Sequence, residues 1–270
     1  MKNQKLVIYS CMTGGYDDIL PVPKDNNIDF VMFTDTPKDK LPKDSNWEFR
    51  QIDSTVARDS HFINRYYKVH PHKFLSDYEA SIYIDSNIQI MNTDYIKDRH
   101  NELLGGKEII SIPKHPERKC VYEEISGVII NNKDKLGKVK NSLKFLIREG
   151  YPEKNGLFEN GFTWRRHNNK KCIEVMNTWW KVLSDPNLSK RDQLSLVYSA
   201  WKHDLKIEMF WKDGKCCKTS DDFKWSKHPR KRKYRFKGRN KVLHELNIIM
   251  LQAQGLYLKL LKIFYKARFK

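Results

Sequence analysis

The sharpest chemical motif in the sequence is a carboxylate that directly follows a short apolar run. Tyr83 and Ile84 end this run, and Asp85-Ser86-Asn87 comes immediately after it. Mg²⁺ and Mn²⁺ prefer oxygen ligands and commonly share the phosphate oxygens of a substrate. Asp85 and Asn87 are therefore predicted metal ligands, although an Asx turn that closes a strand uses the same residue types. Asn87 in place of a second carboxylate lowers the expected metal affinity.

Residues suited to a nucleotide diphosphate precede this motif. Glycines after the first apolar run allow a ligand to approach the backbone, and the tyrosine behind them can stack on a base, although a plain turn explains the glycines equally well. Arg65 and Lys68 lie one helical turn apart and project together, toward a diphosphate or as a solvated face. The predicted nucleotide-binding residues are Thr13, Gly14, Gly15, Tyr16, Asp35, Arg65 and Lys68.

Polar residues farther along the chain are candidates for the acceptor side of a transfer reaction. Glu123 and Glu124 include a possible general base, with a surface loop as the alternative. Asp192 is suited to act as acid, base or ligand of a sugar hydroxyl, but with Ser189 it also approximates a helix capping box. The predicted acceptor- or sugar-binding residues are His115, Arg118, Asn160, Arg166, His167 and Gln193.

Apolar periodicity predicts the elements that position these residues. The expected strands are Lys5–Cys11, Asp29–Asp35, Trp47–Ile52, Ser81–Ile84, Ile109–Ile112, Gly127–Ile130 and Lys206–Trp211. The expected helices are Arg58–Tyr78 with a break at Pro71, Asn141–Glu149, Asn169–Leu183 and Ser189–His203. This alternation predicts an α/β domain with a mixed or mainly parallel, Rossmann-like sheet flanked by helices. Ligands gather at the carboxyl ends of such strands, where Gly14, Asp35 and Asp85 fall.

Taken together, these segments resemble a glycosyltransferase-like domain family that includes plant turgor-regulation and mucilage-related proteins and bacterial members from surface-polysaccharide gene clusters. The matching segments follow one another in order over roughly residues 6 to 205. They are Tyr9–Asp17, Phe30–Asp35, Arg65–His72, Tyr83–Asn87, His115–Glu124, Glu159–Asn168 and Arg191–Ser195.

The family is in turn distantly similar to the glycogenin-like and lipopolysaccharide galactosyltransferases. This resemblance implies a GT-A fold, a UDP-sugar donor and a divalent metal at Asp85 and Asn87. It also implies that Asp192 and Gln193 lie beside the donor sugar. The histidine that completes the metal site in that group has no clear match, and His228 is the nearest candidate. We therefore expect a hexosyltransferase that acts on a glycan or lipid-linked acceptor in bacterial surface-polysaccharide synthesis.

The C-terminal part of the sequence differs in kind from the rest. The formal net charge is +18, and much of the surplus lies after Lys227. From Leu256 onward, lysines recur at helical spacing beside a broad apolar face, which is typical of a helix that lies on a membrane surface. The alternative is a terminal helix packed on the protein or in a dimer. We expect a catalytic domain at residues 1–225 and a basic, membrane-associated tail at residues 226–270.

Other features of the sequence limit the possible locations and functions. The five cysteines show no paired spacing, which favours free thiols. We see no signal peptide and no run long enough to span a membrane, so we expect a cytoplasmic protein on the inner face of the inner membrane. Two rival functions are a catalytically silent GT-A scaffold, suggested by Asn87, and a nucleic-acid-binding protein, suggested by the charge. We expect no nucleic-acid partner, because no binding module is recognisable.

Overall fold

The computed structural model describes residues 5–226 and 241–269, without the side chains of residues 241–247. These residues form two compact units built from interleaved stretches of the chain. Of the described residues, the sheet unit comprises 5–116, 159–177 and 206–226. The helical unit comprises 117–158, 178–205 and the C-terminal helix. His228 and most of the basic run before the last helix lie outside the described residues.

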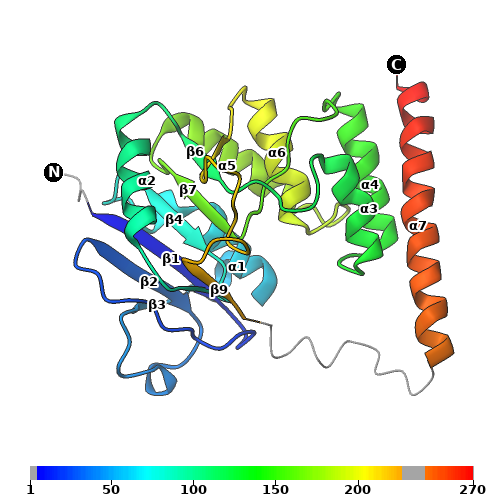
Figure 1. Ribbon diagram of the computed structural model, residues 1–270. Coiled ribbons are helices and arrows are strands. Elements are labelled where there is room, and N and C mark those ends of the chain that lie inside the picture. Colours follow the sequence, from blue (N-terminus) through cyan, green and yellow to red (C-terminus); the bar gives the residue numbers. More distant parts are fainter. Residues whose placement is uncertain (1–4, 227–240, 270) are drawn as a thin grey trace. The chain divides into compact units, whose positions relative to one another are not determined.

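A seven-stranded sheet organises the sheet unit (Figure 1). In chain order its strands are β1 (Leu6–Met12), β2 (Ile28–Thr34), β3 (Glu48–Gln51), β4 (Ser81–Ile84), β6 (Ile110–Ile112), β7 (Phe162–Arg165) and β8 (Glu208–Met209). Their order across the sheet is β3-β2-β1-β4-β7-β6-β8. Only β7 runs antiparallel to its neighbours, and the other pairs are parallel. A separate antiparallel pair joins β5 (Ile88–Ile90) to β9 (Phe223–Trp225).

Both faces of this sheet are covered, which explains why its central strands are continuous apolar runs. Along β1, Ile8 and Met12 pack in one cluster with α2 (Asp94–Gly105), while Tyr9 and Cys11 pack in another with α1 (Ser60–Val69). The alternation follows from the two-residue period of a strand. The sequence correctly predicted this α/β architecture of a mainly parallel sheet flanked by helices.

The helical unit contains α3 (Val121–Ile130), α4 (Leu136–Arg148), α6 (Asp192–Lys202) and α7 (Lys241–Arg268). Helix α5 (Lys170–Leu183) runs from the sheet unit into the helical unit. Single 3₁₀ turns occupy Lys38–Lys40, Ser54–Val56 and Pro71–Lys73. The last begins at Pro71, where the sequence predicted that the helix breaks. Within the described residues, no helix is long and apolar enough to cross a membrane.

One predicted strand is wrong, and several elements were missed. Gly127–Ile130 is the last turn of α3, because Val121, Ile125 and Val128 continue its apolar face at helical spacing. Four apolar residues alone do not distinguish a strand from a helix. The sequence did not predict α2, β5, β7 or β9. All five cysteines are buried free thiols, as predicted.

Candidate active site

The loops that follow β1 and β2 meet at the carboxyl edge of the sheet. The backbone N–H of Gly14 donates a hydrogen bond of 2.7 Å to Asp35 Oδ2. The hydroxyl of Thr13 donates to the carbonyl oxygen of Ser60 at 2.7 Å, which ties the same loop to the start of α1. Gly14 and Gly15 have φ angles of 64° and 51°, a left-handed conformation that favours glycine. The predicted glycine loop is therefore real, and Asp35 holds it.

The loop after β1 also reaches the turn after β4. Ser86 Oγ donates a hydrogen bond of 2.6 Å to Asp17 Oδ2, so the serine inside the Asp85-Ser86-Asn87 motif anchors the end of the glycine loop. Tyr16, between these contacts, is exposed. The sequence named Tyr16 for stacking on a base, and its exposure is compatible with that prediction.

Asp85 lies beside two basic residues of α1. Lys68 Nζ is 3.4 Å and Arg65 Nη1 is 3.9 Å from Asp85 Oδ1. The Asp85 side chain is 31% exposed and that of Lys68 only 1%. The helical turn between Arg65 and Lys68 thus brings both cations to the strand end, as their spacing predicted. This group of two cations and one carboxylate is suited to an anionic ligand.

Lys68 is fixed by its surroundings. Its ammonium lies 4.7 Å from the ring centroid of Tyr83. Its carbonyl oxygen accepts hydrogen bonds from the Tyr9 hydroxyl at 2.9 Å and from Arg165 Nη2 at 2.8 Å. Lys68 is thus enclosed and faces Asp85, whereas Arg65 keeps 15% of its side chain exposed.

Asp85 and Asn87 fit a divalent cation only as part of its ligand set. Asn87 is buried, and its Nδ2 donates to the carbonyl oxygen of Ser226 at 3.1 Å. Within residues 5–226 and 241–269, no three His, Cys, Asp or Glu side chains are grouped to hold a metal ion. Mg²⁺ commonly keeps water and takes substrate phosphates as ligands. A cation held by Asp85 and Asn87 would therefore depend on a bound diphosphate.

Glu159 is a residue of this region that the sequence did not single out as a site residue. The backbone holds it close, since Asp85 N–H donates to the carbonyl oxygen of Gly161 at 2.8 Å. Burial raises the pKa of Glu159; Lys218 and a hydrogen bond from Cys216 oppose this effect, and the nearby Asp85 charge adds to it. The atoms Glu159 Oε2 and Asn160 Nδ2 are enclosed without a hydrogen-bond partner among the described residues. Only its place beside Asn160 in the sequence could have indicated Glu159.

Two other predicted residues of the sheet unit have structural contacts. Arg166 donates to the carbonyl oxygens of Leu103 and Leu104 at 2.9 and 2.7 Å, which caps the end of α2, and it pairs with Glu79. His167 is fully buried, with Nε2 2.8 Å from the carbonyl oxygen of Leu75. The proposed site therefore does not include Arg166 or His167. His115 is buried near the start of the loop that follows β6.

The predicted acidic residues of the helical unit divide into one exposed and one buried glutamate. Glu123 Oε2 accepts from the backbone N–H of Lys119 at 2.9 Å and so caps the start of α3. Glu124 is buried and pairs with Arg118 Nη1 at 2.9 Å. Burial raises the pKa of Glu124, while Arg118 and Arg191 lower it and Asp192 raises it. Of the two, Glu124 better fits a general base.

Gly127 makes the Arg118–Glu124 pair possible. A Cβ atom at Gly127 would lie 2.5 Å from Arg118 Nε and 2.8 Å from its Cζ. The guanidinium therefore crosses α3 directly over the glycine, one turn beyond Glu124. Only a residue without a side chain allows this approach.

Asp192 and Gln193 begin α6. Asp192 is buried, and its Oδ1 accepts from the backbone N–H of Gln193 at 3.0 Å. Gln193 Oε1 accepts from Arg191 Nη2 at 2.7 Å. Ser189 does not form a capping box with Asp192, because the N-cap residue of α6 is Arg191. The Ser189 hydroxyl accepts from the backbone N–H of Arg191 at 3.3 Å and donates to Asp134 Oδ2 at 2.7 Å. Arg118, Glu124, Arg191 and Asp192 thus form a charged group in the helical unit, in which the two acids are buried and the two arginines are partly exposed.

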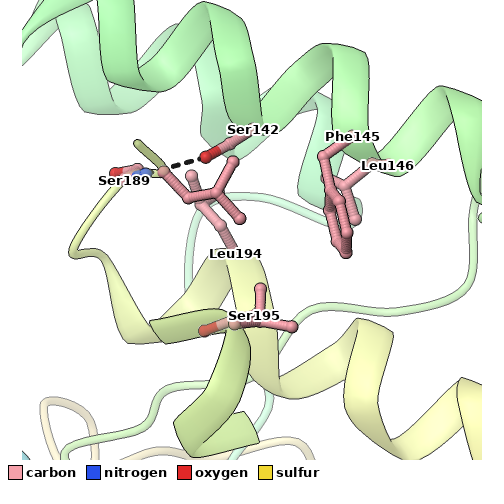
Figure 2. A pocket seen from close by; sticks show the side chains of 8 residues that line it. Ser142, Phe145, Leu146, Ser189, Leu194 and Ser195 are labelled. Carbon is pink, nitrogen blue, oxygen red and sulfur yellow. Dashed lines mark hydrogen bonds between the residues drawn. The ribbon is translucent and has the colours of Figure 1, made fainter. Parts of the chain in front are cut away.

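A small cavity lies near the start of α6, and none of the residues that line it is charged (Figure 2). Its volume is about 10 Å³, enough for about one water molecule. Its walls are mainly apolar, and at one side Ser142 Oγ accepts from the Ser189 backbone N–H at 2.9 Å. The cavity is too small for a sugar.

The structure is an α/β domain whose sheet has a polar carboxyl edge. The chain belongs to the TOD1/MUCI70 glycosyltransferase-like domain family, whose model matches residues 1–228. No curated protein matches the sequence. Among solved structures, the chain is similar to the apo structure of the bifunctional glycosyltransferase WbbM, with a TM-score of 0.45 and 13% sequence identity. That similarity covers 78% of this chain and 39% of WbbM.

Proposed function

We propose that the protein transfers a hexose from a UDP-sugar to a glycan or lipid-linked acceptor in the synthesis of a bacterial surface polysaccharide. The observation that carries the proposal is the group of Arg65, Lys68 and Asp85 beside the glycine loop. A nucleotide-sugar has both an anionic diphosphate and a base, and this edge of the sheet offers cations for the first and an exposed Tyr16 for the second.

In the proposed reaction, the bond between the anomeric carbon and the donor phosphate breaks, and a bond to the acceptor oxygen forms. Negative charge grows on the departing diphosphate, so fixed cations stabilise the transition state. Arg65 contacts the diphosphate, and Lys68 positions Asp85. A divalent cation held by Asp85 and Asn87 would supply further charge neutralisation.

Residues of the helical unit are proposed to serve the acceptor and the donor sugar. Glu124 accepts the proton of the acceptor hydroxyl, and Arg118 orients its carboxylate through their 2.9 Å ion pair. Asp192 and Gln193 bind sugar hydroxyls. Asn160 and His115 are proposed on the sugar side of the sheet edge. The acceptor is proposed to lie at the cytoplasmic face of the inner membrane.

A thermal-shift screen of the purified chain against UDP-, GDP-, CMP- and dTDP-sugars, each with and without Mn²⁺, tests the proposal. A ligand that binds only the native state raises the melting temperature. We expect UDP-sugars to do so, Mn²⁺ to add to the shift only when donor is present, and Asp85→Ala to abolish it. If the folded protein is stabilised by no donor, the alternative suggested by Asn87, a catalytically silent scaffold, replaces the proposal.

A further inference from the structure

Helix α7 has one face that packs within the helical unit. Leu258 and Tyr265 are buried there in a cluster with α3 and α4. Gly255 lies against α3, where its carbonyl oxygen accepts from Ser126 Oγ at 3.3 Å and a Cβ atom would lie 2.9 Å from Ile130. This face is therefore a close helix–helix contact, and α7 is docked along it (Figure 1).

The opposite face of α7 is apolar and exposed. At 100° per residue, its large members fall within an arc of about 100° centred opposite the packed face. They are Ile249, Leu256, Leu260, Ile263 and Phe264, and their exposed fractions are 60, 60, 59, 66 and 56%. Ala253 and Ala267 fall in the same arc, which contains no charged residue between Ile248 and Phe269. Single exposed apolar residues are ordinary, but a continuous row along five turns marks an interaction surface.

The lysines of α7 lie to one side of this apolar face. Lys262 Nζ is 2.8 Å from Glu153 Oε1, and Lys266 pairs with the same carboxylate. Both ammonium groups also lie over the ring of Tyr122, at 5.0 and 5.7 Å from its centroid. These two lysines thus help to dock α7, and the outward face is left to the apolar side chains.

Charge distinguishes the two occupants that such a face would fit, a second copy of the chain and a lipid surface. Eight basic residues and no acidic residue lie in residues 230–241 of the sequence, which lead up to and include the first residue of α7: Arg230, Lys231, Arg232, Lys233, Arg235, Lys237, Arg239 and Lys241. Two copies joined along α7 would bring together two chains that each have a net charge of +18. An anionic bilayer attracts each nearby basic residue by about 1 kcal/mol.

We propose that the exposed apolar face of α7 binds the surface of an anionic lipid bilayer. Ile249, Leu256, Leu260, Ile263 and Phe264 enter the region between headgroups and acyl chains. The inference is independent of the proposed glycosyl transfer, since it rests on the exposed face and the charge.

The experiment is co-sedimentation of the full chain with vesicles of phosphatidylcholine and phosphatidylglycerol, and with vesicles of phosphatidylcholine alone. We expect binding to the anionic vesicles that weakens as salt is added. The triple variant Leu256→Gln, Leu260→Gln, Ile263→Gln should bind on the order of 100-fold more weakly. The double variant Met91→Gln, Met209→Gln changes exposed apolar residues outside α7 and should bind like the unchanged chain.

Equal binding by the triple variant and the unchanged chain would overturn the proposal. So would an unchanged chain that ignores vesicles but forms a dimer that the triple variant loses, because a second copy would then cover the face. If the triple variant fails to fold, Leu260→Trp provides a milder probe in the same assay. Its fluorescence should shift to the blue with anionic vesicles and be quenched by brominated lipid, and an unchanged spectrum with bound vesicles would also overturn the proposal.

Discussion

Lys68 Nζ lies 3.4 Å from Asp85 Oδ1, and this contact joins the last turn of α1 to the carboxyl end of β4. Lys68 is almost fully enclosed, while Asp85 keeps part of its surface in solvent. The pair therefore has two roles. Asp85 compensates a buried charge, and it remains available to a ligand. These roles predict different responses to substitution.

Asp85→Asn should destabilise the protein by about 1–3 kcal/mol, because it leaves the Lys68 ammonium enclosed without its carboxylate. The double variant Lys68→Met, Asp85→Asn should recover most of that stability but still lack the donor-induced thermal shift. Urea unfolding and the thermal-shift assay measure the two properties separately. Asp94→Asn, at an exposed aspartate of α2, is the matched control and should change neither. Donor binding by the double variant would contradict the proposed role of Asp85.

Glu159 should make the protein less stable as the pH rises above about 4.5. Its native pKa is raised by burial, so the native state binds the proton more tightly than the unfolded state does. By linkage, its contribution to the unfolding free energy falls as pH increases from the unfolded pKa through the native one. Urea unfolding of the unchanged chain and Glu159→Gln over this range should show a difference that changes with pH. Glu174→Gln, at an exposed residue of α5, is the control for the substitution itself.

His100 should have the opposite effect on stability. Burial lowers its pKa to about 4, and its Nδ1 accepts a hydrogen bond of 3.0 Å from Trp164 Nε1. The unfolded state takes up a proton near pH 6.5, whereas the native state does so only near pH 4. The unfolding free energy should therefore fall as the pH drops through this range, by up to about 3 kcal/mol. In His100→Asn this fall should be smaller. The buried His70 is present in both proteins, so subtracting the two curves of unfolding free energy against pH removes its contribution. Parallel curves would contradict the assignment.

The sequence predicted the carboxyl edge of the sheet better than it predicted the rest of the site. Gly14, Asp35 and Asp85 each end a continuous apolar run, and parallel strands bring their carboxyl ends to one edge, so local pattern and topology agree. The spacing of Arg65 and Lys68 sufficed to predict that both project toward the same side. The sequence did not reveal that Lys68 would be enclosed, because the burial of this helix residue depends on Tyr83 of β4 and Arg165 of β7.

Residues with strong hydrogen-bonding groups were harder to interpret. Arg166 and His167 have the side chains of a sugar-binding loop, yet they bond to backbone carbonyl oxygens near the ends of α2 and of the turn before β4. Those carbonyls come from segments about 60 to 90 residues earlier in the chain, and α2 itself was not predicted. The strand predicted at Gly127–Ile130 failed for a related reason. The short apolar run suggested a strand, but its residues continue the apolar face of α3, and Gly127 lies under the Arg118 side chain.

Gly127→Ala should destabilise the helical unit although alanine is the better helix former by about 1 kcal/mol. The new Cβ atom would displace Arg118 from Glu124 and leave a buried carboxylate without its ion pair. Urea unfolding should show a loss of about 1–3 kcal/mol, and a smaller loss when Glu124→Gln is already present. Gly137→Ala in α4 is the matched control, because no atom lies within 4 Å of its added Cβ. An equal loss in both Glu124 backgrounds would show that the ion pair is not the cause.

Gly255→Ala tests the docking of α7 on α3, and here the sign of the effect depends on one neighbour. The added Cβ atom would lie 2.9 and 3.0 Å from Cγ1 and Cδ1 of Ile130, closer than carbon atoms pack. Overpacking of this kind should outweigh the gain in helix propensity and lower the unfolding free energy by about 1 kcal/mol. In an Ile130→Ala background the obstacle is gone, so the same substitution should raise stability by up to about 1 kcal/mol. Urea unfolding of the four proteins measures this reversal, and an effect of equal sign and size in both backgrounds would show that Ile130 is not the obstacle to the added Cβ atom.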